Sequence, residues 1–299
     1  MKPTVIRKAA WPALVPGFLL IAAACGGSGG AQADVEDQLG FTQEGTDQRH
    51  GRVENLIAAC MRTQGFEYVP VDPKAQRAAL LGNSSLSDED FEKQYGDGIT
   101  TLFEQRQKLA AGPNQAIRVR LSETEGRAYD RALLGDGGGT FVQAMDTGDF
   151  SQLGGCTRKA TEEAFGGATV LASLQTKLNE LDKQIENDPR LVAAIAAWSG
   201  CMRESGHDVA HPNDVDSSLH QRLEAIVGPD AAAGRVRGPN LPYDRAALAA
   251  LQRLEVELVL ADTRCEAKHI SNVEEKVRPD YERPFRENNA QLLKQVPAP

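Results

Sequence analysis

The chain has 299 residues, a formal net charge of −9 at pH 7 and 41% hydrophobic residues, which is enough for a helical core. The acidic balance argues against nucleic acid and anionic headgroups as partners of the folded body. Aromatic residues make up only 5% of the chain, which disfavours a carbohydrate-binding platform because such platforms present several aromatic faces.

The first 24 residues have the pattern of a secretory signal peptide. Three positive residues precede an apolar stretch, residues 9–24, that ends at Cys25 and is followed by a glycine-rich run. The stretch is short for a membrane span and contains two prolines, so we interpret residues 1–24 as a cleaved signal rather than a transmembrane helix. Cleavage removes the three positive residues and brings the formal charge to −12.

Residues 21–25, Ile-Ala-Ala-Ala-Cys, resemble the bacterial lipobox, in which the cysteine receives lipid and the chain is cut just before it. Ala22 stands where leucine is most common, so the alternative is an ordinary leader-peptidase site that leaves Cys25 as a free thiol. Cysteine parity favours lipid, because the other four cysteines form an even set for an oxidising compartment. Two acyl chains on Cys25 would hold the protein firmly on the outer face of the cytoplasmic membrane.

A flexible polar tether is predicted over residues 25–50, followed by a first helical half over residues 51–167. This half opens with a helix over about residues 52–64, whose apolar residues recur at spacings of three and four. The helix ends in the hexad Cys60-Met61-Arg62-Thr63-Gln64-Gly65, and its glycine suits a left-handed position after the last turn. In the extended strip that follows, Pro70 and Pro73 are expected to prevent a new helix for several residues.

The rest of the first half is predicted to contain short helices. Ser87 and the three acidic residues after it indicate a capped helix to about Tyr95, and Ser122 with Glu125 indicates a capping box for a helix that ends before Gly135. Further helices are expected over residues 100–111 and around Cys156. The glycine run 135–139 lacks the Lys-Ser/Thr of a phosphate-binding loop, so we interpret it as a flexible connector.

The strongest predicted helix lies in residues 168–190, which connect the two halves. Its apolar residues recur at spacings of three and four: Val170, Leu171, Leu174, Leu178, Leu181 and Ile185. A core or hairpin helix is favoured over an extended coiled coil because the pattern is short. An Asp-Pro pair at residues 188–189 ends it, and the second helical half follows over residues 191–299.

The second half repeats two features of the first in the same order. The hexad returns as Cys201-Met202-Arg203-Glu204-Ser205-Gly206, and Tyr-Asp-Arg-Ala occurs at residues 129–132 and 243–246. Helices are expected over residues 219–227, from Leu248 past Cys265 to about Pro279, and over residues 284–295. Because no strand pattern of period two is present, the predicted fold is all-α, with two pseudo-repeated halves joined by a long helix.

Four cysteines remain for disulfides. The order of the repeat favours pairing within each half, Cys60 with Cys156 and Cys201 with Cys265. The alternative, Cys60 with Cys201 and Cys156 with Cys265, stays open because spacing alone does not determine connectivity. Such bridges would each stabilise the fold by about 4–5 kcal/mol in the chain-entropy model.

Metal binding is the sharpest chemical alternative to disulfides. Cys201, His207, His211, Cys265 and His269 include the residue types of a Cys₂His₂ zinc site. Against this, His207 follows a capping glycine and His211 precedes a proline, so the two do not share a helical face. Exported cysteines in even number are usually oxidised, and we therefore predict no metal and no cofactor.

The hexad, the strip after it and the later cysteine resemble a pattern of secreted proteins and lipoproteins of actinobacteria. The resemblance covers residues 56–70 and 198–212, with weaker support around Tyr129 and Tyr243. It implies an exported helical protein and no activity, because no function is assigned to the pattern.

These features favour a lipid-anchored binding or interaction protein without enzymatic activity, whose partners are the membrane and an envelope protein. One alternative is a cell-envelope enzyme whose carboxylates come together from distant positions, and a weaker one is a metal-binding lipoprotein. The acidic residues 88–90 and Glu92 are not evidence for catalytic carboxylates, because acidic side chains are favoured in the first turn of a helix. A pocket with convergent carboxylates would favour the enzyme, and a shallow groove would favour the binding protein.

Overall fold

The structure is a computed structural model and describes residues 43–81, 86–109, 112–141, 149–232 and 241–298, together with Val35, Leu39 and Ala144. Within this part the fold is all-α, as predicted, with no strand and an isolated bridge between Gly139 and Leu153. The signal peptide, Cys25 and the first part of the tether lie outside it. No helix in the described ranges has the combined length and hydrophobicity of a membrane span.

The helices of the first half are α2 (Gln43–Thr63), α3 (Pro73–Leu80), α4 (Asp88–Tyr95), α5 (Phe103–Leu109), α6 (Pro113–Arg120), α7 (Glu123–Leu134) and α9 (Gly155–Ala164). The connecting helix is α10 (Ala168–Glu186). The second half contains α11 (Pro189–Glu204), α12 (Asn213–Val227), α13 (Pro229–Ala232), α14 (Arg245–His269), α15 (Ser271–Asn288) and α16 (Ala290–Leu293). The predicted capping box of Ser122 and Glu125 and the Ser87 cap are both present.

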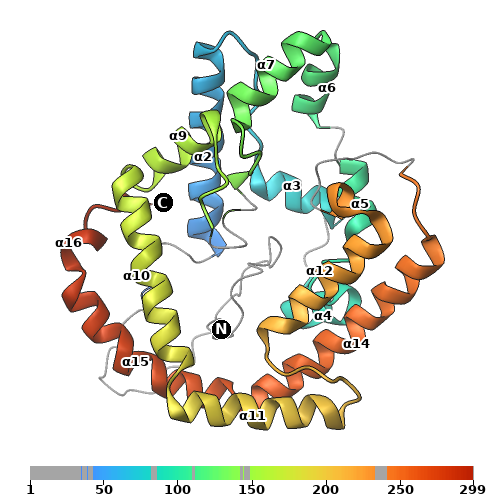
Figure 1. The fold of residues 1–299 in the computed structure, drawn as a ribbon, viewed down its shortest axis with the longest axis vertical. Coiled ribbons are helices and arrows are strands. Elements are labelled where there is room, and N and C mark those ends of the chain that lie inside the picture. The colour runs from blue at the N-terminus through green and yellow to red at the C-terminus, as the bar shows by residue number, and fades with distance from the viewer. Residues whose placement is uncertain are drawn as a thin grey trace.

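Figure 1 shows the helices following one another around a ring. Helix α2 packs against α9, α10 descends on the left, and α11 crosses at the bottom to meet α14. Helices α15 and α16 return beside α10, and α4 and α12 pack against α14. One hydrophobic cluster runs through both halves and includes Ile57, Trp198 and Leu258. The two halves therefore share a single core.

Both hexads form the same helix end. Gly65 and Gly206 have φ values of 82° and 89°, in the left-handed region that glycine adopts without strain. The N–H groups of the residues that follow, Phe66 and His207, donate to the carbonyls of Met61 and Met202 at 3.0 and 2.9 Å. The predicted role of the glycines is confirmed.

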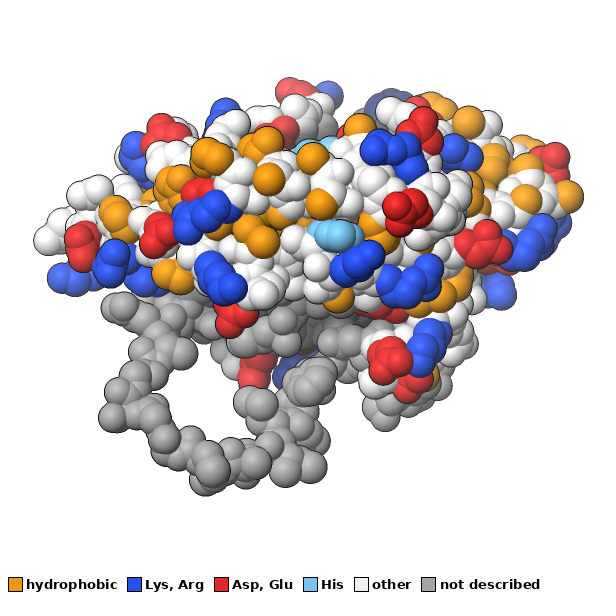
Figure 2. Space-filling view, turned by 90° about the horizontal axis from the view of Figure 1, so that it is seen from below, with side chains coloured by type: hydrophobic (Ala, Val, Ile, Leu, Met, Phe, Trp, Pro, Cys, Tyr) orange, Lys and Arg blue, Asp and Glu red, His pale blue; other side chains and the backbone are white. Residues whose placement is uncertain are grey.

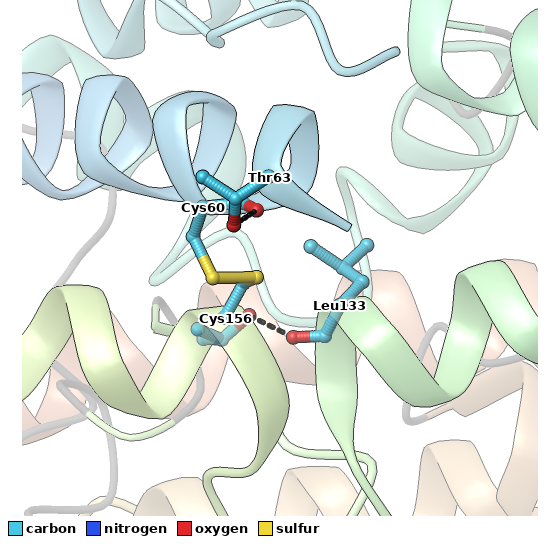
Figure 3. Close-up of a disulfide and its surroundings, with 5 residues drawn as sticks. Cys60, Thr63, Leu133 and Cys156 are labelled. Atoms are coloured by element: carbon cyan, nitrogen blue, oxygen red, sulfur yellow. Dashed lines mark hydrogen bonds between the residues drawn. A yellow bond between two sulfur atoms is a disulfide. The ribbon is translucent and has the colours of Figure 1, made fainter. Parts of the chain in front are cut away.

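The pairing of cysteines within each half is also confirmed, with bonds Cys60–Cys156 and Cys201–Cys265. Figure 3 shows the first bridge joining the last turn of α2 to the first turn of α9, beside the carbonyl of Leu133. The second bridge joins the last turn of α11 to a turn near the end of α14. Disulfides persist in oxidising compartments, so the two bridges indicate an extracytoplasmic location.

The start of α2 differs from the prediction. The helix begins at Gln43, so residues 43–50 are helical and not part of a flexible tether. Arg49 is 1% exposed and donates to the carbonyls of Leu39 and Ala164 at 2.9 Å and of Pro297 at 3.2 Å. Its guanidinium also lies 4.5 Å from the centroid of the Phe165 ring. Arg49 is part of the polar sequence from which a solvent-exposed tether is predicted. In the structure its side chain is buried and donates hydrogen bonds to carbonyls of three separate segments.

Two predictions based on proline are wrong. Pro73 begins α3 instead of preventing a helix, because the missing N–H costs nothing in the first turn. The Asp72 side chain caps this helix by accepting the N–H of Lys74 at 2.9 Å. Helix α15 continues through Pro279 and Pro284, where a boundary between two helices is predicted. Burial of its apolar residues outweighs the hydrogen bonds that these prolines remove.

The glycine run after α7 is closely packed rather than a flexible connector. The Gly139 N–H donates to the Gln152 carbonyl at 3.1 Å. A Cβ atom on Gly137 would lie 2.3 Å from the same carbonyl oxygen, and one on Gly154 would lie 2.3 Å from the Leu134 carbonyl oxygen. The glycines therefore allow the backbone after α7 to approach residues 152–155, which precede Cys156 in the sequence.

The second internal match is not equivalent in the structure. Tyr129 lies inside α7 and is buried, whereas Tyr243 lies before α14. Asp130 pairs with Arg118 on the surface, and Asp244 caps the start of α14 by accepting two backbone N–H groups. Only the hexad is therefore repeated in both sequence and local structure.

The first half also contacts the second through the turn after α4. Glu255 of α14 is fully buried, and its carboxylate accepts the N–H groups of Ile99, Thr100 and Thr101 at 2.7, 2.8 and 2.9 Å. The Thr100 hydroxyl donates to the same carboxylate at 2.5 Å. One side chain of the second half thus holds a turn of the first.

Candidate functional site

A groove with a volume of about 400 Å³ lies between α10 and α15. This volume falls within the range of small-ligand sites in proteins. Its floor includes Leu181 and Phe285, which are 3% and 8% exposed. Pro284 and a set of polar side chains complete the lining: Lys177, Glu180, Gln184, Asp280, Tyr281, Asn288 and Asn289. We call this site the α10–α15 groove.

The two walls follow from helical periodicity. On α10, Lys177, Leu181 and Gln184 are spaced by four and three residues and so share one face. On α15, Asp280 and Asn288 each lie four residues, about one turn, from Pro284, so the three residues share one face. The buried leucines of α10 and Val277 of α15 pack the two helices together beneath these faces.

Ion pairs hold both walls. Lys177 and Glu180 are 2.7 Å apart on α10. Arg190, at the start of α11, donates to Asp280 of the groove and to Asp188, each at 2.8 Å. The Tyr281 hydroxyl donates to Asp188 at 3.1 Å, and this bond raises the pKa of Tyr281. The wall formed by α15 is thereby fixed to the turn between α10 and α11.

Asp188 should make stability depend on pH. The hydrogen bonds from Arg190 hold the pKa of the Asp188 carboxyl well below its usual range. Its stabilising effect is therefore present above the unfolded pKa of about 3.9 and is lost as the pH falls towards the folded value. Asn keeps the helix cap, so Asp188→Asn isolates the charge. We expect the wild type to resist urea better than this variant at pH 7, with the difference shrinking below about pH 4; a constant difference would contradict this assignment.

Several polar groups of the groove are open to a ligand. The side-chain amides of Gln184 and Asn288 make no hydrogen bond with other described residues. Pro284 has no N–H to donate, so the Asp280 carbonyl lacks the partner that an uninterrupted helix would supply. The groove therefore exposes amide donors and acceptors and the ring of Pro284 above a floor of buried apolar side chains.

A buried carboxyl with a raised pKa would favour an enzyme, and Glu255 is such a group. Burial raises the pKa of the Glu255 carboxyl, while its hydrogen bonds with Thr100, Thr101 and Ile99 oppose the shift. A second, more open depression of about 530 Å³ lies nearby between α4 and α14, but Glu255 does not line it. Fully buried behind Thr100 and Thr101, Glu255 acts as a structural acceptor.

The cysteines and histidines considered as zinc ligands do not form a metal site in the structure. Cys201 and Cys265 are bonded to each other and supply no thiolate. His207 and His211 lie in the loop between α11 and α12, and the His211 ring accepts the N–H of Asn213 at 3.2 Å. Among the described residues, no group of three or more His, Cys, Asp or Glu side chains has the arrangement of a metal site. Of the acidic residues at the start of α4, Glu89 pairs with Lys93 at the surface.

A polar cluster outside the groove lies on α2, where residue 50 ends the predicted tether and the predicted helix begins at about residue 52. The Glu54 carboxylate accepts the Tyr68 hydroxyl and the Val71 N–H, each at 2.9 Å, and lies 3.7 Å from His50. Burial is the main cause that raises the pKa of Tyr68. The spacing of four between His50 and Glu54 is the signal that could have indicated this cluster. These hydrogen bonds hold the extended segment after the first hexad, which contains Tyr68 and Val71, against α2.

Sequence reasoning missed the groove because the prolines divide α15 into two predicted helices. Asp280, Pro284 and Asn288 share a face only if the helix is continuous. Comparisons with protein-family models, with curated proteins and with solved structures find no match for this chain.

Proposed function

We propose that this chain is a lipid-anchored, extracytoplasmic binding protein without enzymatic activity, held on the outer face of the cytoplasmic membrane. The α10–α15 groove carries the proposal, because its lining combines the exposed ring of Pro284 with the unpaired amides of Gln184 and Asn288. Its carboxylates, Glu180 and Asp280, are ion-paired and about half exposed, which suits recognition better than acid–base catalysis. The signal peptide, the lipobox-like residues and the two disulfides support export.

We also propose that the two hexad helices are a pseudo-repeat inherited from one unit. Their identical helix ends support this, with equivalent glycines and equivalent buried methionines. The helices to which the cysteines are bonded differ, since Cys156 begins a helix and Cys265 lies near the end of one. The repeated unit is thus the hexad helix and not the whole half.

The anchor is tested by the variant Cys25→Ala. We expect the wild type to remain with washed membranes and to incorporate a labelled fatty acid, and the variant to incorporate none and to be released into the medium. Variants of the paired cysteines would disturb folding, so they are not used here. Release of the wild type without label would overturn the anchor and leave the groove unaffected.

Binding is tested by photo-crosslinking in intact membranes. A photoreactive amino acid at position 288 lies in the groove, and one at position 221 lies on the exposed surface of α12 as a control. We expect crosslinked adducts at position 288 that are absent at position 221. An absence of adducts at position 288 in cells that contain the full envelope would contradict a binding role for this groove.

A further inference from the structure

We infer that Arg49 clamps the segment that leads to the lipid anchor and thereby limits how far the folded body can stand from the membrane. The inference rests on the proposed anchor at Cys25 and adds how that anchor is joined to the fold. Three observations carry it: two buried residues before α2, the hydrogen bonds of the Arg49 guanidinium, and the short distance in sequence between Cys25 and the first buried residue.

The chain already contributes to the core before α2 begins. Val35 and Leu39 are 1% and 4% exposed, and both belong to the hydrophobic cluster that runs through the two halves. The Leu39 N–H donates to the Val35 carbonyl at 3.1 Å. We call these two residues the 35–39 seat. A seat that consists of two aliphatic side chains is weak by itself, because few apolar contacts hold it against local opening.

Arg49 adds the missing hold. Its guanidinium joins the Leu39 carbonyl of the seat to the carbonyls of Ala164 and Pro297, at 2.9, 2.9 and 3.2 Å. Ala164 is the last residue of α9, where carbonyls lack a partner within the helix and a cation is favoured. Burial lowers the pKa of Arg49 to about 10, so the side chain stays charged at neutral pH. Hydrogen bonds from a charged donor are stronger than those between neutral groups.

The other two partners of Arg49 are fixed without the seat. The Cys60–Cys156 disulfide joins α2, which carries Arg49, to α9. The chain after α16 packs on Gly166, where a Cβ atom would lie 2.4 Å from the Gln295 carbonyl oxygen. The 35–39 seat is therefore the part that opens when the Arg49 hydrogen bonds are lost.

The clamp sets the reach of the anchor. Residues 25 and 35 are ten positions apart, so the chain between them spans at most about 35 Å. With the seat open, the link extends to Gln43, eighteen positions from Cys25, and its limit rises to about 60 Å. On the face drawn in Figure 2, positive and negative side chains of the described residues alternate, so this face has no uniform charge to hold it on lipid headgroups. The link itself then limits the distance.

The test is chymotrypsin digestion of the full mature lipoprotein in phospholipid vesicles. Chymotrypsin prefers large apolar residues, and Leu39 and Phe41 are those between Cys25 and α2. With Phe41→Ala in every protein, cleavage after Leu39 frees the body from the lipid. We expect release at least tenfold faster for Arg49→Met than for the parent. The control Arg52→Met, an exposed residue of the same helix, should match the parent.

Val35→Asp provides a second variant that leaves Arg49 intact. It places a charge in the buried seat and lies before the helices of the body, so it should release the body as Arg49→Met does while circular dichroism stays unchanged. This variant separates an open seat from damage to α2.

Equal release from the parent and Arg49→Met overturns the inference, and so does equal release from Arg49→Met and Arg52→Met. Cuts within the helices of Arg49→Met as fast as the cut after Leu39 also overturn it, because unfolding then explains the release. If the parent leaves the vesicles before digestion, the anchor fails and the distance limit fails with it. The rates of cleavage after Leu39 in the soluble chain then still decide whether Arg49 holds the seat.

Discussion

Replacing Cys60 and Cys156 by alanine is expected to lower the free energy of unfolding by about 4–5 kcal/mol and the melting temperature by about 10–20 °C. The bridge spans a sequence separation of 96 residues, and a long closed loop restricts the unfolded chain strongly. A loss of this size is a large part of the net stability of an ordinary domain. Thermal unfolding followed by far-ultraviolet circular dichroism measures it.

The second bridge gives a matched comparison. Cys201→Ala/Cys265→Ala opens a separation of 64 residues, so its loss should be slightly smaller. In addition, the buried Trp198 donates to Asp262 at 2.9 Å across the same pair of helices, which keeps α11 on α14 after the bridge is removed. A reducing agent should lower the melting temperature of the wild type and leave the variant with all four replacements unchanged. Equal melting temperatures of wild type and variants would contradict a stabilising role for the bridges.

The helices with strong apolar periodicity and caps were predictable, because local signals determine them. The hexad ends follow from the glycines, and α7 follows from the Ser122 and Glu125 capping box. The order of the repeat favoured the disulfide pairing that the structure has, although spacing alone left the cross-half pairing open.

The predictions based on polar residues and prolines were wrong where tertiary contacts determine the secondary structure. Arg49 is polar in sequence but buried, since its partners are carbonyls from residues far along the chain. Pro284 breaks a helix in isolation, yet α15 continues through it because Val277 and Phe285 are buried in the core. The groove needs this continuous helix and the neighbouring α10, so no local pattern contains it.

The contact between the halves was equally hidden, because Glu255 and Thr100 are far apart in sequence. Replacing Glu255 by alanine should lower the free energy of unfolding by about 3–5 kcal/mol. The change leaves three buried N–H groups and the Thr100 hydroxyl without their acceptor and opens a space in the interface. Gly96 approaches so closely that a Cβ atom there would lie 2.8 Å from the Glu255 Cγ atom, which shows how tightly the turn is packed.

Glu257 on the same helix is the control, because it is exposed and its replacement by alanine should change stability by no more than about 0.5 kcal/mol. Glu255→Gln should have an intermediate effect, since it restores the volume but points N–H donors at the N–H groups of the turn. Hydrogen exchange of the amides at residues 99–101 distinguishes local from global loss. If Glu255→Ala exposes these amides and splits unfolding into two transitions, the carboxylate is what makes the halves one cooperative unit. If the variant unfolds like Glu257→Ala, the halves are joined by the apolar core alone.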